Sequence, residues 1–124
     1  MSKRIRVMLA DESRAVRLLV ASMLRDDARF DIVAEVSAGA QAVARRDEVD
    51  LLVTDLVLED TDAFSVIADL RSASSALPVV IVAAVDPPYL RNEAAARGAA
   101  GFFTHGTDPA LLVEGLAQAA GGDG

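Results

Sequence analysis

The chain has 124 residues, of which 52% are hydrophobic, and it carries a formal net charge of −7 at neutral pH. This length and apolar content suit one folded domain with its own core, and they argue against intrinsic disorder. The chain has no cysteine, which excludes disulfide bonds and thiolate chemistry, and its negative charge argues against direct binding of nucleic acid. No apolar run approaches the ~20 residues of a membrane span, and the start does not resemble a signal peptide, so we expect a cytoplasmic protein.

Five short apolar runs predict strands, in chain order over residues 5–10, 31–36, 51–55, 78–84 and 100–103. Several of these runs are continuous rather than alternating, which is typical of strands buried on both faces. A segment of helical length follows each run, over residues 13–26, 38–47, 62–72, 87–98 and 107–122. The segment at 38–47 has the weakest helical signal.

Polar and special residues mark the ends of these helices. Ser13, Asp62 and Asp108 stand where N-caps are expected, because their side chains accept hydrogen bonds from free backbone amides. Prolines begin the helix at 87–98, and Gly98 closes it. The first helix carries its apolar residues on one face: Val16, Leu19, Val20, Met23 and Leu24.

The regular alternation of strand and helix predicts one α/β domain over residues 1–124. We expect a doubly wound (βα)5 fold with a five-stranded parallel sheet and helices on both faces. The strand order is expected to be the flavodoxin-like 2-1-3-4-5. Residues 121–124 are expected to form a flexible tail or the start of a linker.

Acidic residues follow two strands that this order places side by side. Asp11 and Glu12 come after the first strand, and Asp55 ends the third. Parallel strands end at one edge of the sheet, where ligands bind, so the three carboxylates should converge. Their mutual repulsion is relieved by a hard divalent cation, and Mg²⁺ prefers oxygen ligands. A carboxylate beside such a metal can act as a nucleophile toward phosphorus.

Each acid also has a plainer interpretation. A single aspartate after a strand is most often a loop cap or a solvated group, and Asp11 stands close to the helix that begins near Ser13. Glu59, Asp60 and Asp62 are expected to form a solvated loop and a helix cap. In the alternative, functional interpretation these three acids raise the local negative potential and disfavour an incoming phosphodonor.

A nucleotide- or flavin-binding domain of the same shape is the less favoured alternative. Such domains hold phosphate with the backbone amides of a glycine- or hydroxyl-rich first loop. Here that loop reads "ADESRAV", which has no glycine and places two acids where the phosphate would sit. The chain also lacks the GxGxxG and GxxxxGK[ST] patterns.

Four segments, at residues 7–17, 50–64, 77–84 and 97–122, carry a resemblance to a known family. Through them, nearly the whole chain resembles the receiver (CheY-like) domain of bacterial two-component response regulators. "VMLADESRAVR" resembles the family's first strand and acidic pair, and "DLLVTDLVLEDTDAF" resembles its phospho-acceptor segment. "LPVVIVAA" is similar to the fourth strand. "RGAAGFFTHGTDPALLVEGLAQAAGG" resembles the end of receivers in the LuxR/NarL class.

The resemblance implies a signalling domain rather than an enzyme. Asp55 would accept a phosphoryl group from a sensor histidine kinase or a phosphotransfer protein. Asp11 and Glu12 would hold Mg²⁺ together with Asp55 and the backbone carbonyl of Val57. In this family the fourth helix, fifth strand and fifth helix, here about residues 87–119, commonly form a homodimer or output surface. A C-terminal DNA-binding output domain follows in most relatives.

The chain departs from the family at its switch positions. The usual threonine or serine is Ala83, the usual lysine is His105, and Phe102 stands at the aromatic switch position. His105 is either a cation facing the phosphoryl group, a neutral loop residue or a metal ligand. Two functions follow, a receiver phosphorylated on Asp55 with altered switching, or a phosphorylation-independent pseudo-receiver that binds other proteins.

Overall fold

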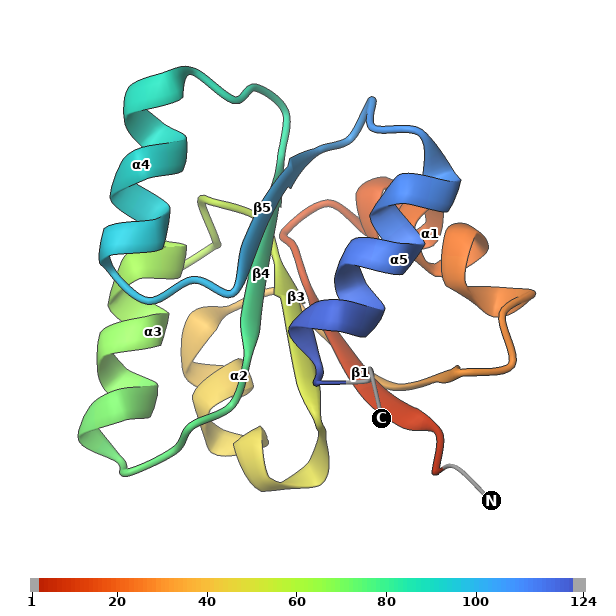
Figure 1. Ribbon diagram of the computed structural model, residues 1–124. Coiled ribbons are helices and arrows are strands. Elements are labelled where there is room, and N and C mark those ends of the chain that lie inside the picture. The colour runs from red at the N-terminus through yellow and green to blue at the C-terminus, as the bar shows by residue number, and fades with distance from the viewer. Residues whose placement is uncertain (1–2, 122–124) are drawn as a thin grey trace.

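The computed structural model describes residues 3–121, and they form a five-stranded parallel sheet in the order β2-β1-β3-β4-β5 (Figure 1). The strands are β1 (Ile5–Ala10), β2 (Phe30–Val36), β3 (Leu51–Thr54), β4 (Val79–Ala83) and β5 (Gly101–Thr104). Both the strand order and the parallel pairing were predicted and are confirmed. Of the predicted tail, residues 122–124 lie outside the described residues.

The helices are α1 (Arg14–Arg25), α2 (Gly39–Ala44), α3 (Ala63–Ser72), α4 (Pro88–Ala96) and α5 (Pro109–Ala119). The weak signal at 38–47 corresponds to the short α2, and a 3-10 turn at Arg46–Glu48 follows it. No helix within residues 3–121 is long and apolar enough to cross a membrane.

The predicted helix caps are confirmed by hydrogen bonds. Ser13 Oγ accepts from the amide of Val16 at 3.2 Å, and a carboxylate oxygen of Asp62 accepts from the amide of Ser65 at 2.8 Å. Asp108 does the same for the first turn of α5. The φ of +96° at Gly98 explains why a glycine closes α4, because side chains disfavour that left-handed conformation.

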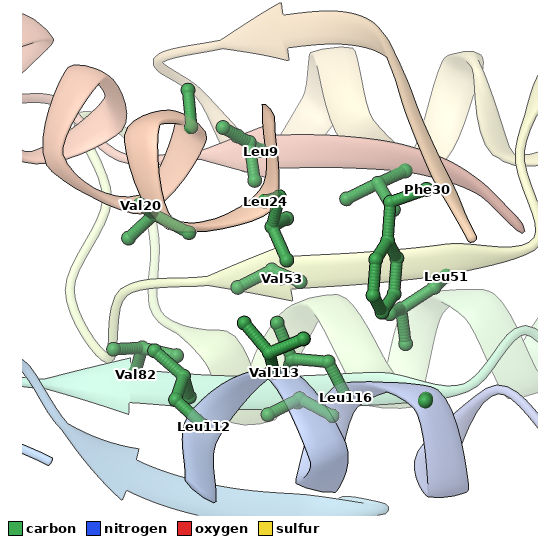
Figure 2. Close-up of a cluster of buried hydrophobic side chains, with 14 residues drawn as sticks. Leu9, Val20, Leu24, Phe30, Leu51, Val53, Val82, Leu112, Val113 and Leu116 are labelled. Atoms are coloured by element: carbon green, nitrogen blue, oxygen red, sulfur yellow. The ribbon is translucent and has the colours of Figure 1, made fainter. Parts of the chain in front are cut away.

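Helices cover both faces of the sheet, and each face has its own core. Side chains of α1 and α5 pack on β1, β3 and β4 on one face, as Figure 2 shows for Leu9, Val53, Val82 and Leu116. On the other face α2 and α3 pack on the same central strands, and α4 joins them beside β4 and β5. The central strands are therefore buried on both sides, as their continuous apolar runs predicted.

Asp60 fixes the start of α2 from a distant loop. Its two carboxylate oxygens accept hydrogen bonds from the amides of Gly39, at 2.6 Å, and Ala40, at 3.1 Å. These bonds lower the pKa of the Asp60 carboxyl below its ordinary value. A Cβ atom at Gly39 would lie 2.5 Å from Thr61 Cγ2, so only glycine permits this close approach. Asp60 is exposed, as predicted for this loop, and its side chain also caps α2, which the sequence did not indicate.

We expect Asp60→Ala to lower the midpoint of thermal unfolding by a few degrees at neutral pH, because two amides of α2 lose their acceptors. The difference in midpoint between the two proteins should shrink as the pH falls through the lowered pKa of Asp60. Protonation of the wild-type carboxylate then removes the stabilisation that the variant already lacks. Thermal unfolding followed by circular dichroism across pH measures both effects. Glu59→Ala removes the same charge from the same loop and should leave the midpoint nearly unchanged.

Candidate functional site

The ends of β1 and β3 bring Asp11 and Asp55 together. The last residues of the two strands, Ala10 and Thr54, are paired in the parallel register. The amide of Asp55 donates to the carbonyl of Ala10 at 2.9 Å, and the amide of Asp11 donates to the carbonyl of Val36 at 3.1 Å. Both aspartates therefore leave the sheet at its carboxyl edge, the upper end in Figure 1.

Short hydrogen bonds orient both carboxylates. Asp11 Oδ1 accepts from the amide of Ser13 at 2.8 Å, and Asp55 Oδ1 accepts from the amide of Leu56 at 2.8 Å. The buried hydroxyl of Thr54 donates to the backbone carbonyl of Asp55 at 2.9 Å. Each carboxylate thus has one oxygen fixed by the backbone and a second oxygen outside that bond. This arrangement pre-orients the pair for a ligand.

His105 reaches the same place from the other side of β4. It follows the end of β5, and its amide donates to the carbonyl of Ala83 at 3.0 Å. One ligand atom from each of Asp11, Asp55 and His105 lies within 4.8 Å of the others. His105 Nε2 is buried and has no hydrogen-bond partner among the residues that the structure describes.

Burial dominates the electrostatics of the two aspartates. It raises the pKa of the Asp11 and Asp55 carboxyls above the ordinary value of 3.8, because the ionised form loses hydration. The amides of Ser13 and Leu56 oppose this rise. Asp11 is only 5% exposed. The pair is therefore costly to keep charged without a counter-charge, and a bound divalent cation supplies one.

The other two predicted metal ligands, Glu12 and Val57, are both exposed residues. Glu12 is exposed and contributes no atom to the group of three, although its charge further raises the pKa of Asp55. Val57 is 56% exposed and forms an isolated antiparallel bridge with Asp62. The hydrogen bonds of that bridge come from the flanking residues, so the carbonyl of Val57 is not used by it.

The donor set fits a hard divalent cation. Two desolvated carboxylates with one oxygen each to offer, and a backbone carbonyl close by in sequence, are the ligands that Mg²⁺ takes from proteins. Glu12 is close enough to Asp55 to add negative potential. The acidic cluster of Asp11 and Asp55 is also consistent with a phosphorylation site.

Arg17 is a neighbour of the site that the sequence analysis missed. Its Nη1 donates to the backbone carbonyl of Asp11, and its Nε lies 3.3 Å from Glu35 Oε1 on β2. Its positive charge opposes the rise in the pKa of Asp11. Its position on α1, one residue after Val16 of the apolar face, was the feature of the sequence that could have indicated a partly buried arginine.

Phe102 is held inside the molecule beside Ala83. It is 5% exposed and packs in the cluster formed by α3, β4, α4 and β5, which also contains Ala83, itself 3% exposed. Arg91 Nη1 donates to the carbonyl of Phe102 at 2.9 Å, and its guanidinium carbon lies 5.4 Å from the ring centroid. The same guanidinium lies 2.5 Å from Asp86 Oδ2. Phe102 is thereby tied to the loop after β4.

A family model, the response regulator receiver domain, matches residues 7–117. Chemotaxis protein CheY of Listeria monocytogenes is 23% identical over 118 residues, covering 94% of this chain and 98% of that protein. The nitrate/nitrite response regulator protein homolog of Haemophilus influenzae is 24% identical and covers 99% of this chain and 60% of its own length. A putative transcriptional regulator of Pseudomonas aeruginosa is 32% identical over 80% of this chain and 48% of that protein.

Solved structures agree with the family model. The signal receiver domain of the putative response regulator NarL from Mycobacterium tuberculosis superposes with a TM-score of 0.89 at 25% identity, covering 98% of this chain and 99% of that one. A LuxR-family two-component response regulator from Aurantimonas reaches 0.87 at 24% identity over 97% of this chain and 87% of that one, which supports the fold.

The chain belongs to the response regulator receiver domain family. It is a receiver domain of two-component systems, with receivers of the NarL/LuxR family among its structural neighbours. It is accordingly a signalling module rather than an enzyme.

Proposed function

We propose that this domain accepts a phosphoryl group on Asp55 from a sensor histidine kinase or a phosphotransfer protein, with Mg²⁺ at the site. The observation that supports this most directly is the pairing of two desolvated carboxylates, Asp11 and Asp55, at the ends of neighbouring strands. A lone surface aspartate would not have its charged form destabilised in this way. With Asp11 beside it, Asp55 can act as a nucleophile while the two carboxylates together bind a cation.

Asp55 is the nucleophile in this proposal. Its free carboxylate oxygen forms the new bond to phosphorus while the bond between phosphorus and the donor nitrogen breaks, and the released imidazole takes a proton from solvent. Asp11 and Glu12, with the carbonyl of Val57, are the remaining proposed ligands of Mg²⁺. The bound cation supplies positive charge that offsets the repulsion between carboxylate and phosphoryl oxygens.

We further propose that the response to phosphorylation is altered. Ala83 has no hydroxyl to donate to a phosphoryl oxygen, and such a bond to a charged group is worth ~1.5–3 kcal/mol. His105 provides an imidazole in place of a permanently charged ammonium group. Without that hydroxyl, phosphorylation shifts the conformational equilibrium of the domain less. Phe102, at the aromatic switch position, is already buried without phosphorylation.

Membership of the family supports proposals about the partners of this domain. The surface formed by α4, β5 and α5 is the proposed homodimer or output face, and it carries the exposed side chains of Tyr89 and Leu111. Ala94 is buried in the core, whereas Ala95 and Ala96 are exposed there. We also propose a DNA-binding output domain as a partner, because two relatives that the chain matches over 48% and 26% of their length are named as a putative transcriptional regulator and a transcriptional regulatory protein.

Incubation with a small-molecule phosphodonor, followed by intact-mass measurement, tests the function. We expect a gain of one phosphoryl group that requires Mg²⁺ and disappears when a chelator removes the cation. A chain that binds Mg²⁺ but gains no phosphate, even from a range of donors, would instead support the pseudo-receiver. That alternative draws on the missing hydroxyl at Ala83 and the missing lysine at His105.

A further inference from the structure

We propose that His105 completes a three-ligand site with Asp11 and Asp55 that binds borderline divalent cations, such as Co²⁺ and Zn²⁺, more tightly than Mg²⁺. The proposal rests on the proposed function only in placing a divalent cation at this edge of the sheet. It does not require that Asp55 be phosphorylated. It concerns the imidazole nitrogen of His105, because a site for Mg²⁺ made of the two carboxylates does not need a nitrogen ligand.

The unpaired imidazole nitrogen is the first observation. His105 Nε2 is shielded from solvent, yet no group among the described residues accepts from it or donates to it. Burying a polar nitrogen in this way costs free energy, so such atoms normally have a partner. A metal ion is a partner that the neutral ring can bind through its lone pair.

The spacing of the three side chains is the second observation. Their ligand atoms lie within 4.8 Å of one another. Within residues 3–121, however, no carboxylate oxygen lies within 4.0 Å of a nitrogen of His105, which is the limit for an ion pair. The imidazole is therefore not engaged directly by either carboxylate. Ligands bound to one ion at about 2.1 Å lie up to about 4.2 Å apart, so a small inward movement of the side chains closes the site.

The chemistry of the donors then selects the cation. Mg²⁺ binds almost entirely through oxygen, whereas imidazole nitrogen suits Zn²⁺ and its neighbours in the transition series. Two carboxylates and one imidazole leave positions open for water or a phosphoryl oxygen. Two carboxylates also balance the charge of one divalent ion.

Arg17 is a positive group close to Asp11 that would oppose a bound cation. Its guanidinium donates to the backbone carbonyl of Asp11 rather than to the carboxylate, and Glu35 lies 3.3 Å from its Nε. Much of its charge is therefore compensated by Glu35 on β2. Glu12, in contrast, adds negative potential at Asp55.

The composition of the chain makes the test clean. His105 is the only histidine and there is no cysteine, so no other imidazole or thiolate competes for the ion. The untagged chain is titrated calorimetrically with Co²⁺, Zn²⁺ and Mg²⁺, and Co²⁺ is followed by its visible absorption. We expect Co²⁺ to bind about tenfold or more tightly than Mg²⁺. His105→Gln should weaken Co²⁺ binding by about tenfold or more while changing Mg²⁺ binding about twofold at most.

A measurement without any variant guards against a folding defect. The ring nitrogens of ¹⁵N-labelled His105 give unambiguous signals, and we expect one to shift strongly when diamagnetic Zn²⁺ is added. An unchanged ratio of Co²⁺ to Mg²⁺ affinity in His105→Gln, or an imidazole signal unaffected by Zn²⁺, overturns the proposal. Either result leaves phosphorylation of Asp55 with Mg²⁺ untouched, because that function is measured by phosphoryl gain and is lost in Asp55→Asn.

Discussion

Asp55→Asn is expected to abolish phosphoryl uptake completely. Asparagine keeps the oxygen that accepts from the amide of Leu56, so the loop after β3 should hold its conformation. It removes the anionic oxygen that attacks phosphorus, and a neutral amide is a far weaker nucleophile and metal ligand. Intact mass after incubation with a phosphodonor and Mg²⁺ measures the effect. The variant should also unfold at a slightly higher temperature, because the raised pKa shows that the native fold disfavours the charge.

Asp69→Asn is the matched control for this variant. Asp69 is an exposed residue of α3 outside the group of Asp11, Asp55 and His105, and its replacement changes the net charge by the same amount. It should gain a phosphoryl group at the wild-type level. Undiminished phosphoryl gain by Asp55→Asn would show that another residue is the acceptor, and the proposed function would then fail.

Ala83→Thr is expected to strengthen the coupling between phosphorylation and the rest of the domain. The new hydroxyl would lie at the carboxyl end of β4, from which the loop to α4 departs. A hydrogen bond to a phosphoryl oxygen is worth ~1.5–3 kcal/mol, or roughly 10- to 100-fold in the ratio of switched to unswitched molecules. Changes in the ring signals of Phe102 and in amide exchange over the loop before α4, on phosphorylation, report that ratio.

The same substitution carries a cost in the unphosphorylated state. Ala83 is almost fully buried beside Phe102, and overpacking such a site costs about 1–3 kcal/mol. Ala83→Ser adds one atom fewer and serves if the threonine variant folds poorly. Ala84→Thr is the positional control, because Ala84 is exposed one residue further on. If both Ala83 variants fold and phosphorylate but respond like the wild type, the missing hydroxyl does not explain any altered switching.

The sequence predicted the features that depend on local chemistry and periodicity. Continuous apolar runs marked strands buried on both faces, and Ser13, Asp62 and Asp108 marked helix starts, because capping is settled within three residues. The alternation of strands and helices predicted a parallel sheet in the flavodoxin-like order. Because parallel strands end at the same edge of the sheet, this order also predicted that Asp11 lies beside Asp55.

Other features depend on contacts between distant segments, which no local pattern carries. Asp60 resembles any solvated acid in sequence, but it meets the amides of Gly39 and Ala40 across two loops. The sequence left three interpretations of His105 open. Only the folded chain shows that His105 Nε2 is buried without a partner among the described residues, and that one ring nitrogen of His105 lies close to the carboxylates of Asp11 and Asp55.

The amino-acid sequence by itself determined the fold class, the strand order and the acidic edge, because apolar periodicity and the geometry of parallel strands leave few other solutions. The tertiary structure alone decided which groups are desolvated at that edge and which of them lie within reach of one another. Burial and distance are properties of the packed chain, and they set the pKa of Asp11 and Asp55 and the partners of His105.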